Sequence, residues 1–342
     1  MIWRGLDLCC PACRGDLTET GDTEPELRCA ECNARYPVIL GIPDLRVFDD
    51  PYIAREADRA KGRALAERFD DLDFAGLVHH YYAATPVVTA AQASAFTAGL
   101  LAAEARARAT LSAWEGAPPS TPREGLLLEL GCGTGPMLLA ARGRYAAAAG
   151  VDIAFRWLVM GKKRLMEAGA DIPTICACAE ALPFRDSISA VVVGDAVIEN
   201  VQDQRRTLSE AYRVLAPGSK LHLTTSNRFS IGPDPQTGIW AVGFLPTSMV
   251  HARVRRSGGI PPKRTLLSAP ALRAMMRDAS FAEIRLGLPV FPAEQRAQFP
   301  PLLRAIARVH DVATTLPITR QAMFAIGPKL TARGTRPPSG RA

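Results

Sequence analysis

Short segments rich in apolar residues recur along the chain from residue 126 onward, separated by segments of helical length. Residues 126–130, 150–151, 172–177, 188–193 and 220–225 have the pattern of short buried strands. Mostly apolar runs of this length, such as LLLEL at 126–130, are typical of buried strands. Their alternation with helical segments predicts an α/β sheet in this part of the chain.

The segments on either side of these strands have a different pattern. Apolar residues recur at helical spacing over 95–114, and the proline-rich residues 118–122 then form a linker. Apolar and basic residues alternate over 299–330, which predicts an amphipathic helix that packs on the sheet or lies on a membrane surface; we favour packing. The expected division is an N-terminal module at 1–50, a helical lid and linker at 51–122, the α/β domain at 123–332 and a disordered tail at 333–342.

Composition is ordinary for a globular protein, since 48% of the 342 residues are hydrophobic and 22% are charged. The net charge of +7 is unevenly distributed. Residues 1–50 hold 5 basic and 10 acidic side chains, whereas residues 251–342 hold 16 basic and 4 acidic ones. The basic C-terminal region suits RNA, an anionic lipid or an acidic partner, or is simply a solvated surface.

No run of apolar residues is long enough to span a bilayer, and residues 1–10 lack the features of a signal peptide. We therefore expect a cytoplasmic protein without a transmembrane segment, whose contact with a membrane would be peripheral. Nothing in the sequence indicates an oligomeric state. Cysteines in a reducing compartment are more often metal ligands or core residues than disulfides.

Four of the eight cysteines form two C-x-x-C pairs, Cys10 with Cys13 and Cys29 with Cys32. Two such turns complete a tetrahedral shell of four sulfurs, and their separation is typical of structural zinc. Four protein ligands leave no open position on the metal, so the predicted zinc is structural. A module of fifty residues has a small core, and the metal would stabilise it. We expect its core to be separate from that of the α/β domain.

The segment ARYPVILGIPDL at 34–45 follows the second cysteine pair. Together with the cysteines, it resembles the zinc-ribbon proteins that act as small activator subunits of tRNA and rRNA methyltransferases. The resemblance covers about residues 7–47. It implies a domain that docks on a methyltransferase, here fused to it in one chain.

A glycine-rich turn, Gly131, Gly133 and Gly135, follows the first predicted strand. Such glycines let the backbone approach a ligand closely, and Asp152 ends the next strand, where a nucleotide-binding α/β unit places its ribose carboxylate. The dinucleotide-binding pattern G-x-G-x-x-G does not fit this spacing.

In order, ELGCGTG at 129–135, GVD at 150–152 and RVLAPG at 213–218 resemble the motifs of class I S-adenosylmethionine-dependent methyltransferases. The resemblance implies a seven-stranded, doubly wound, Rossmann-like sheet over about residues 125–290. It places Gly131, Gly133 and Gly135 along the methionine and ribose of S-adenosylmethionine. It further implies the following positions: Glu129 near the methionine ammonium, Asp152 on the ribose hydroxyls, Ile153 on adenine, and Ala179 and Glu180 at the adenine edge. Ser219 departs from the second glycine common at the turn after 213–218, which is remote from the cofactor.

The loop at 195–203 is similar to the acceptor-facing loop of quinone-ring methyltransferases, and we expect Glu199 or Asn200 to face the acceptor. Asn200 as a helix cap is the alternative. Trp240, Phe229 and Phe244, in an insertion after the fifth strand, suit an apolar acceptor pocket or a purely structural loop.

The leading hypothesis is therefore a methyltransferase for a small-molecule or lipid-like acceptor, such as a hydroxylated or quinone-type ring. Methylation of rRNA or tRNA is the main alternative, because a ribbon joined to a methyltransferase domain also resembles rRNA guanine methyltransferases. A non-catalytic docking subunit is the third hypothesis, which the intact glycine turn and Asp152 argue against.

Overall fold

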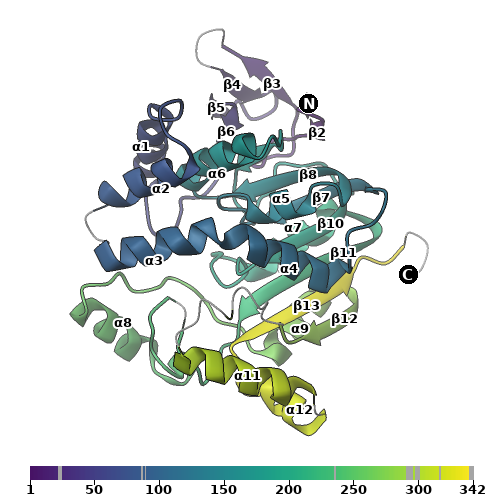
Figure 1. Cartoon of the computed structure of the whole chain (residues 1–342). Coiled ribbons are helices and arrows are strands. Elements are labelled where there is room, and N and C mark those ends of the chain that lie inside the picture. Colours follow the sequence, from purple (N-terminus) through teal and green to yellow (C-terminus); the bar gives the residue numbers. More distant parts are fainter. Residues whose placement is uncertain are drawn as a thin grey trace.

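The computed structural model describes residues 1–21, 25–85, 88, 90–234, 236–289, 296, 301–315 and 317–338. A small N-terminal β module lies at one end, a large sheet with helices on both faces forms the middle, and a group of helices forms the opposite end (Figure 1).

The large sheet has seven strands in the order β12-β13-β11-β10-β7-β8-β9. They are β7 (Arg123–Leu130), β8 (Tyr145–Asp152), β9 (Thr174–Cys176), β10 (Ser189–Asp195), β11 (Leu215–Ser226), β12 (Ala282–Gly287) and β13 (Lys329–Thr335). β13 is antiparallel to both of its neighbours, while β7 to β11 are parallel. The order in which strands are added reverses at β7, because β8 and β9 lie on one side of it and β10 and β11 on the other. Ligands of doubly wound folds bind at such a point. The predicted seven-stranded α/β fold is confirmed.

Helices cover both faces of this sheet (Figure 1). On one face lie α5 (Pro136–Ala141) and α6 (Phe155–Glu167), with α1 (Arg55–Ala66) and α2 (Phe74–Ala83) packed on α6. The same face carries α3 (Ala90–Leu101) and α4 (Ala103–Glu115), and α4 packs on α5. On the other face α7 (Gln204–Val214) packs on β11 and on α9 (Ala269–Asp278), which contacts β12 and β13.

The N-terminal module contains β1 (Ile2–Trp3), β2 (Leu6–Asp7), β3 (Leu17–Thr20), β4 (Glu26–Cys29), β5 (Arg35–Ile39) and β6 (Ile42–Pro43). It continues the large sheet, because Asp44 bridges to Cys176 of β9 and the Leu45 N–H donates to the Cys176 carbonyl. Leu8 also forms an antiparallel bridge to Phe184.

One hydrophobic core joins this module to the sheet. Leu8, Leu17 and Leu27 belong to the same buried cluster as Leu128 and Phe184. The expectation of two separate cores is therefore wrong. The apolar strands at the exit of the N-terminal module reach the open edge of β9. Contact between the module and this edge buries the apolar side chains of both, and so leaves less apolar area exposed than two separate cores would.

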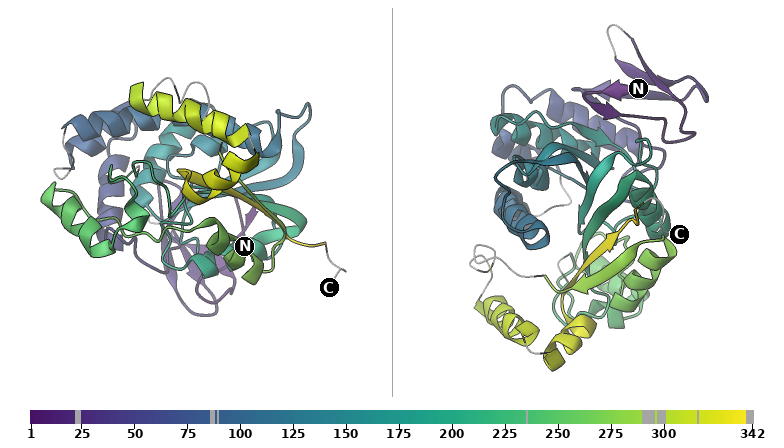
Figure 2. Two further views of the ribbon diagram at one scale, coloured as in Figure 1. Left: turned by 90° about the horizontal axis from the view of Figure 1, so that it is seen from below. Right: turned by 90° about the vertical axis from the view of Figure 1, so that its right-hand side faces the viewer.

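The C-terminal helices also differ from expectation. The segment expected to be one amphipathic helix forms α11 (Pro301–Thr315) and α12 (Pro317–Ile326), which lie at the end of the molecule away from the sheet (Figure 2). The apolar side chains of Leu302, Ile306 and Val309 are exposed, so the favoured packing of this face on the sheet is wrong.

The predicted disordered tail also begins too early. Residues 333–335 belong to β13, where the Arg333 and Thr335 backbones pair with β11, and Gly334 is buried. Residues 339–342 lie outside the described part of the chain. Among the described residues, none of the helices is long and apolar enough to cross a bilayer.

Candidate cofactor-binding site

The glycine turn after β7 has a backbone that side chains would disfavour. Gly131, Gly133 and Gly135 all have positive φ, at 68°, 50° and 75°. A Cβ atom on Gly131 would lie 2.7 Å from a methyl group of Val197, so the turn approaches the loop after β10 closely. A Cβ atom on Gly133 would meet no protein atom within 4 Å, because this residue faces an open cavity.

Asp152 ends β8 beside this turn and is held by two backbone groups. One carboxylate oxygen accepts from the Gly133 N–H at 2.8 Å, and the other accepts from the Ala154 N–H at 2.8 Å. Burial raises the pKa of Asp152, although these two hydrogen bonds oppose the rise. Each carboxylate oxygen keeps a further lone pair, so the group can still accept two hydroxyl donors.

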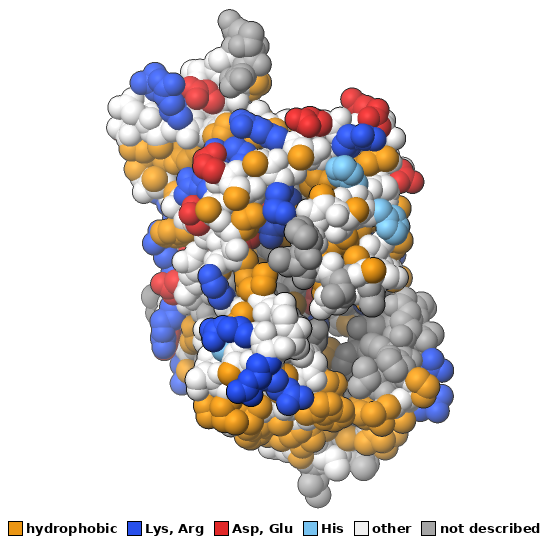
Figure 3. Space-filling view, turned by 90° about the vertical axis from the view of Figure 1, so that its left-hand side faces the viewer, with side chains coloured by type: hydrophobic (Ala, Val, Ile, Leu, Met, Phe, Trp, Pro, Cys, Tyr) orange, Lys and Arg blue, Asp and Glu red, His pale blue; other side chains and the backbone are white. Residues whose placement is uncertain are grey.

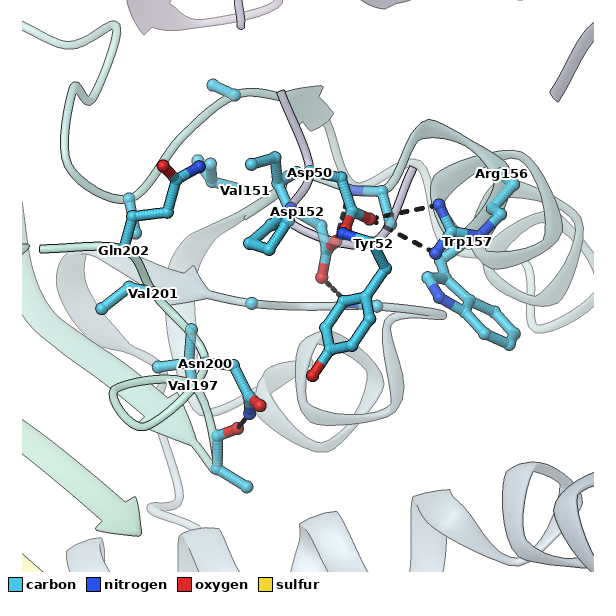
Figure 4. A pocket seen from close by; sticks show the side chains of 18 of the residues that line it. Asp50, Tyr52, Val151, Asp152, Arg156, Trp157, Val197, Asn200, Val201 and Gln202 are labelled. Atoms are coloured by element: carbon cyan, nitrogen blue, oxygen red, sulfur yellow. Dashed lines mark hydrogen bonds and ion pairs between the residues drawn. The ribbon is translucent and has the colours of Figure 1, made fainter. Parts of the chain in front are cut away.

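Gly131, Gly133 and Asp152 line a cavity of about 380 Å³, a volume within the range of small-ligand sites, whereas Gly135 is not among the lining residues. Ile153, Ala179 and Glu180 also line it, as the resemblance implied. On the opposite side Val197, Asn200, Val201 and Gln202 face the cavity (Figure 4).

Residues that the sequence analysis did not identify complete the wall. Asp50 and Tyr52, at the exit from the N-terminal module, lie over Asp152, and Trp157 of α6 lies beside them (Figure 4). Leu100 of α3 closes another side. No motif or spacing marks these positions, because they reach the cavity from other parts of the chain.

A buried network of charges fixes the segment that carries Asp50. The Arg46 guanidinium donates to both oxygens of Asp44, at 2.7 and 2.6 Å, to Asp58 at 2.7 Å and to the Ile153 carbonyl at 3.1 Å. Burial opposes ionisation of Asp44, but Arg46 and Arg59 together more than offset it and lower the pKa of Asp44. Arg156 pairs with both Asp58 and Asp50. The network thereby ties the N-terminal module and α1 to the loop that holds Ile153.

Two acidic residues of the predicted site have contrasting environments, and of the two only Glu180 lines the cavity. Glu180 is satisfied, because it accepts from the Gln202 N–H at 2.7 Å. Glu129 is 3% exposed, and one of its oxygens has no hydrogen-bond partner among the described residues. Burial, with the charges of Asp195 and Asp152, raises the pKa of Glu129 well above its ordinary value. A cationic group beside Glu129 would supply the missing partner.

The two candidates for the acceptor side differ in position. Asn200 lines the cavity and donates from Nδ2 to the Ala196 carbonyl at 2.8 Å. Glu199 does not line it; its carboxylate is buried and accepts from the Thr225 hydroxyl at 2.9 Å and the Ser226 N–H at 3.1 Å. The structure therefore corrects the expectation for Glu199, whose side chain connects the loop to the end of β11.

The aromatic insertion is also placed elsewhere. Trp240 and Phe244 are about half exposed, and neither these two nor Phe229 lines the cavity beside Asp152. The expected aromatic acceptor pocket is thus not formed at this cavity.

The four predicted metal ligands converge at the other end of the N-terminal module. Their sulfur atoms all lie within 4.8 Å of one another, with Cys10 3.7 Å from Cys32 and Cys13 3.4 Å from Cys29. Four sulfurs in a tetrahedron around zinc, each at about 2.3 Å, would be about 3.8 Å apart. The cluster therefore fits a tetrahedral metal, and the fifth nearby cysteine, Cys9, is not part of it.

Comparison with known proteins places this site in a family. A family model described as a methyltransferase domain matches residues 128–223. Demethylmenaquinone methyltransferase of Thermus thermophilus is 34% identical over 168 residues, which cover 46% of this chain and 74% of that protein. Mitochondrial 2-methoxy-6-polyprenyl-1,4-benzoquinol methylase of Leishmania donovani is 30% identical over 141 residues, which cover 39% of this chain and 48% of that protein. The chain thus spans about half the length of that curated relative.

Solved structures of similar fold have low sequence identity. One is phosphoethanolamine N-methyltransferase 2 of Haemonchus contortus in complex with S-adenosyl-L-methionine. The aligned region covers 68% of this chain and 52% of that protein's chain, with a TM-score of 0.46 and 16% identity. Another is a chain from the Haloferax volcanii complex between the Trm112 methyltransferase activator and a methyltransferase. The aligned region covers 68% of this chain and 92% of that chain, with a TM-score of 0.44 and 20% identity.

The glycine turn, the carboxylate at the end of β8 and the strand order agree with the family match. The chain belongs to the class I S-adenosylmethionine-dependent methyltransferases.

Proposed function

We propose that this enzyme methylates a small, hydroxylated ring of the quinol type. The observation that carries the proposal is the uncharged part of the cavity lining, which includes Leu100, Val197, Asn200 and Val201. Arg156, which also lines the cavity, is already paired with two aspartates. An apolar ring fits such a wall better than a polyanion does. The named acceptors of the two curated relatives are also quinols or quinones.

The residues around the cavity suggest how the cofactor is held. In this proposal Asp152 accepts hydrogen bonds from the ribose hydroxyls, and Ile153 with Ala179 and Glu180 surrounds the adenine. Gly131, Gly133 and Gly135 let the backbone follow the methionine part, and Glu129 gains its missing partner from the ammonium group. S-adenosylmethionine supplies an electrophilic methyl group when bound. The chain contributes mainly by positioning and by excluding water from the reacting atoms.

We assign the acceptor side to Asn200 rather than to Glu199. The Asn200 amide is oriented by the Ala196 carbonyl. Its oxygen accepts from Nε2 of Gln236 at 3.4 Å and keeps a second lone pair for an acceptor hydroxyl. An amide can orient a hydroxyl but cannot remove its proton at neutral pH. In this proposal Asn200 is therefore a positioning group for the acceptor.

We also propose that Cys10, Cys13, Cys29 and Cys32 bind one structural zinc ion. The separations of the sulfurs support this assignment, and the absence of disulfides among the described cysteines leaves all four available as thiolates. A closed shell of four protein ligands has no position for a substrate.

The function is tested by methyl transfer from radiolabelled S-adenosylmethionine to two acceptor classes in parallel. One reaction contains a demethylated quinol with a short prenyl tail, kept reduced, and the other contains total RNA. We expect label in the organic-soluble quinol and none in RNA, and we expect Asp152→Ala to reduce the quinol signal at subsaturating cofactor.

Label in RNA but not in the quinol would replace the proposal with the RNA alternative. Cofactor binding by calorimetry, without label in either fraction or in an organic extract of cells, would instead favour the non-catalytic docking subunit.

A further inference from the structure

Large apolar side chains are exposed together at the end of the molecule opposite the N-terminal module. Six of them define what we call the apolar end: Trp240, Phe244, Met249, Leu302, Ile306 and Val309. Their exposed fractions run from 39% for Ile306 to 69% for Val309. Figure 3 shows hydrophobic side chains gathered in a band at this end, with Lys and Arg side chains next to it. A continuous patch of exposed apolar side chains marks a contact surface more often than isolated exposed apolar residues do.

Helix α11 has its apolar stripe turned outward. Leu302, Ile306 and Val309 follow at helical spacing and are exposed, while the small Ala307 is buried. The apolar stripe of a surface helix normally faces the core. The outward stripe contains branched aliphatic residues. Burial of this stripe against another apolar surface would therefore lower the free energy of the molecule.

The aromatic insertion and the neighbouring α8 (Thr247–Arg256) extend this surface. Phe244 is held by a tilted contact with the Phe229 ring, at 5.3 Å between centroids, yet remains 55% exposed. Met249, on the first turn of α8, is 59% exposed. The structure therefore presents these apolar groups on ordered elements and does not hide them.

The charges beside the apolar end are almost all positive. Arg253, Arg255 and Arg256 are exposed on the last turn of α8. Over residues 227–273 the sequence has seven basic residues and a single acidic one, Asp234, which is buried in an ion pair with Arg264. A surface that combines exposed Trp, Phe and aliphatic groups with flanking arginines is complementary to the interface of an anionic bilayer. A protein partner would need an acidic rim around an apolar centre, whereas a bilayer of anionic lipid supplies both in its plane.

We propose that the apolar end docks on the surface of a bilayer that contains anionic phospholipid. Trp240, Phe244, Met249 and the stripe of α11 enter the interface, and Arg253, Arg255 and Arg256 contact the lipid phosphates. The cavity beside Asp152 is lined by other residues, so the inference does not depend on the proposed acceptor.

The test is co-sedimentation of the full chain with vesicles of phosphatidylcholine alone or mixed with phosphatidylglycerol. We expect binding to the mixed vesicles that weakens with salt, and little binding to phosphatidylcholine alone. The double variant Met249→Glu with Val309→Glu should bind at least tenfold more weakly, because it brings two charges to the interface. The triple variant of Arg253, Arg255 and Arg256 to Gln should lose about a hundredfold, since each basic side chain contributes about a factor of five.

Two controls separate docking from folding. Met166→Glu changes a Met that is 53% exposed on α6, away from the apolar end, and should bind vesicles as the wild type does. S-adenosylmethionine affinity should be unchanged in all of these variants. Tryptophan emission should shift to the blue with mixed vesicles in the wild type but not in Trp240→Phe.

Equal vesicle binding by the wild type and the double glutamate variant would overturn the proposal. The proposal would also fail if the wild type binds no vesicles and is a dimer that the double variant dissociates, because a second copy would then cover the apolar end. Vesicle binding without methyl transfer to a quinol would leave this inference standing while removing the proposed function.

Discussion

For individual carboxylates of the predicted site, the effect on folding stability differs from the effect on ligand binding. Asp152 has its two oxygens held by backbone N–H groups, so its orientation is set before a ligand arrives. Glu129 is buried, and one of its oxygens has no partner within the part of the chain that the structure describes, which costs stability in the absence of a cation. The two carboxylates therefore differ in what a neutral replacement should do.

Replacing Asp152 by alanine should weaken S-adenosylmethionine binding tenfold to a hundredfold. Loss of hydrogen bonds to a charged group costs about 1.5–3 kcal/mol, which corresponds to about that change in Kd. Isothermal calorimetry measures it, with Asp70→Ala, a change of an exposed aspartate after α1, as the control. Because burial raises the pKa of Asp152, affinity should also fall on acidification before an ordinary aspartate would titrate. An unchanged Kd in Asp152→Ala would exclude the ribose role.

Glu129→Gln should stabilise the free protein while weakening cofactor binding. The raised pKa of Glu129 means that the ionised form is disfavoured in the fold, so at pH 8 its charge reduces the free energy of unfolding. Differential scanning fluorimetry should show a higher Tm for the variant at pH 8, with a smaller difference at pH 5. Calorimetry should show weaker binding of S-adenosylmethionine. A lower Tm at pH 8 would indicate that Glu129 has a structural partner instead.

At the scale of elements, the joint between the N-terminal module and β9 connects the cysteine cluster to the cavity. β6 continues the sheet edge through Asp44 and Leu45, and the chain then passes through Arg46 to Asp50 and Tyr52 in the cavity wall. The buried guanidinium of Arg46 contacts the module, α1 and the Ile153 loop at once. A disturbance of the module should therefore reach the cofactor.

Loss of the proposed zinc ion should affect both the N-terminal module and cofactor binding. Cys29→Ser should remove about one zinc per chain, lower the main unfolding transition and weaken S-adenosylmethionine binding about fivefold or more. Metal analysis, calorimetry and scanning calorimetry measure the three effects. Cys9→Ser is the matched control, since Cys9 is buried beside the cluster without belonging to it and should retain zinc. A zinc-free Cys29→Ser protein with wild-type cofactor affinity would show that the module is energetically independent.

At the scale of the whole molecule, α4 is fastened to the sheet by a charged contact at the face opposite the module's core. Glu115 ends α4, and its carboxylate lies 2.6 Å from Nε2 of His222 on β11 while accepting from the Tyr145 hydroxyl on β8 at 3.0 Å. The Trp114 ring stacks on His222, at 5.5 Å between centroids. These contacts hold the helical lid region, which includes Leu100, against the sheet.

This fastening should make stability depend on acid. Burial opposes ionisation of Glu115, but His222, Tyr145 and Arg123 more than offset it and lower the pKa of Glu115 to about 2. A carboxylate with a lowered pKa in the fold contributes stability above its unfolded pKa, and that contribution is lost as the pH falls toward the folded value. The Tm difference between wild type and Glu115→Gln should therefore be largest near neutral pH and shrink from about pH 4.5 downward. A difference that stays constant to pH 3 would contradict this linkage.

The local pattern of the sequence determined the strands of the parallel sheet, the glycine turn, Asp152 and the four cysteines. Each of these depends on neighbours a few residues away: a buried strand needs a run of apolar residues, a tight turn at positive φ needs glycine, and a C-x-x-C turn aims two sulfurs at one point. The motif resemblance added the expectation that Ile153, Ala179 and Glu180 lie beside the cofactor, and all three line the cavity.

The tertiary structure alone decided how these parts meet. Tyr52 and Leu100 precede the glycine turn in the chain and reach the cavity from other elements. No motif in the sequence marks either residue. The sequence also did not determine which surface covers an apolar stripe. The apolar residues at the exit of the N-terminal module pack at the open edge of β9, whereas the stripe of α11 faces solvent. Periodicity states which residues share a face, but what covers that face depends on the surfaces that the rest of the fold leaves available.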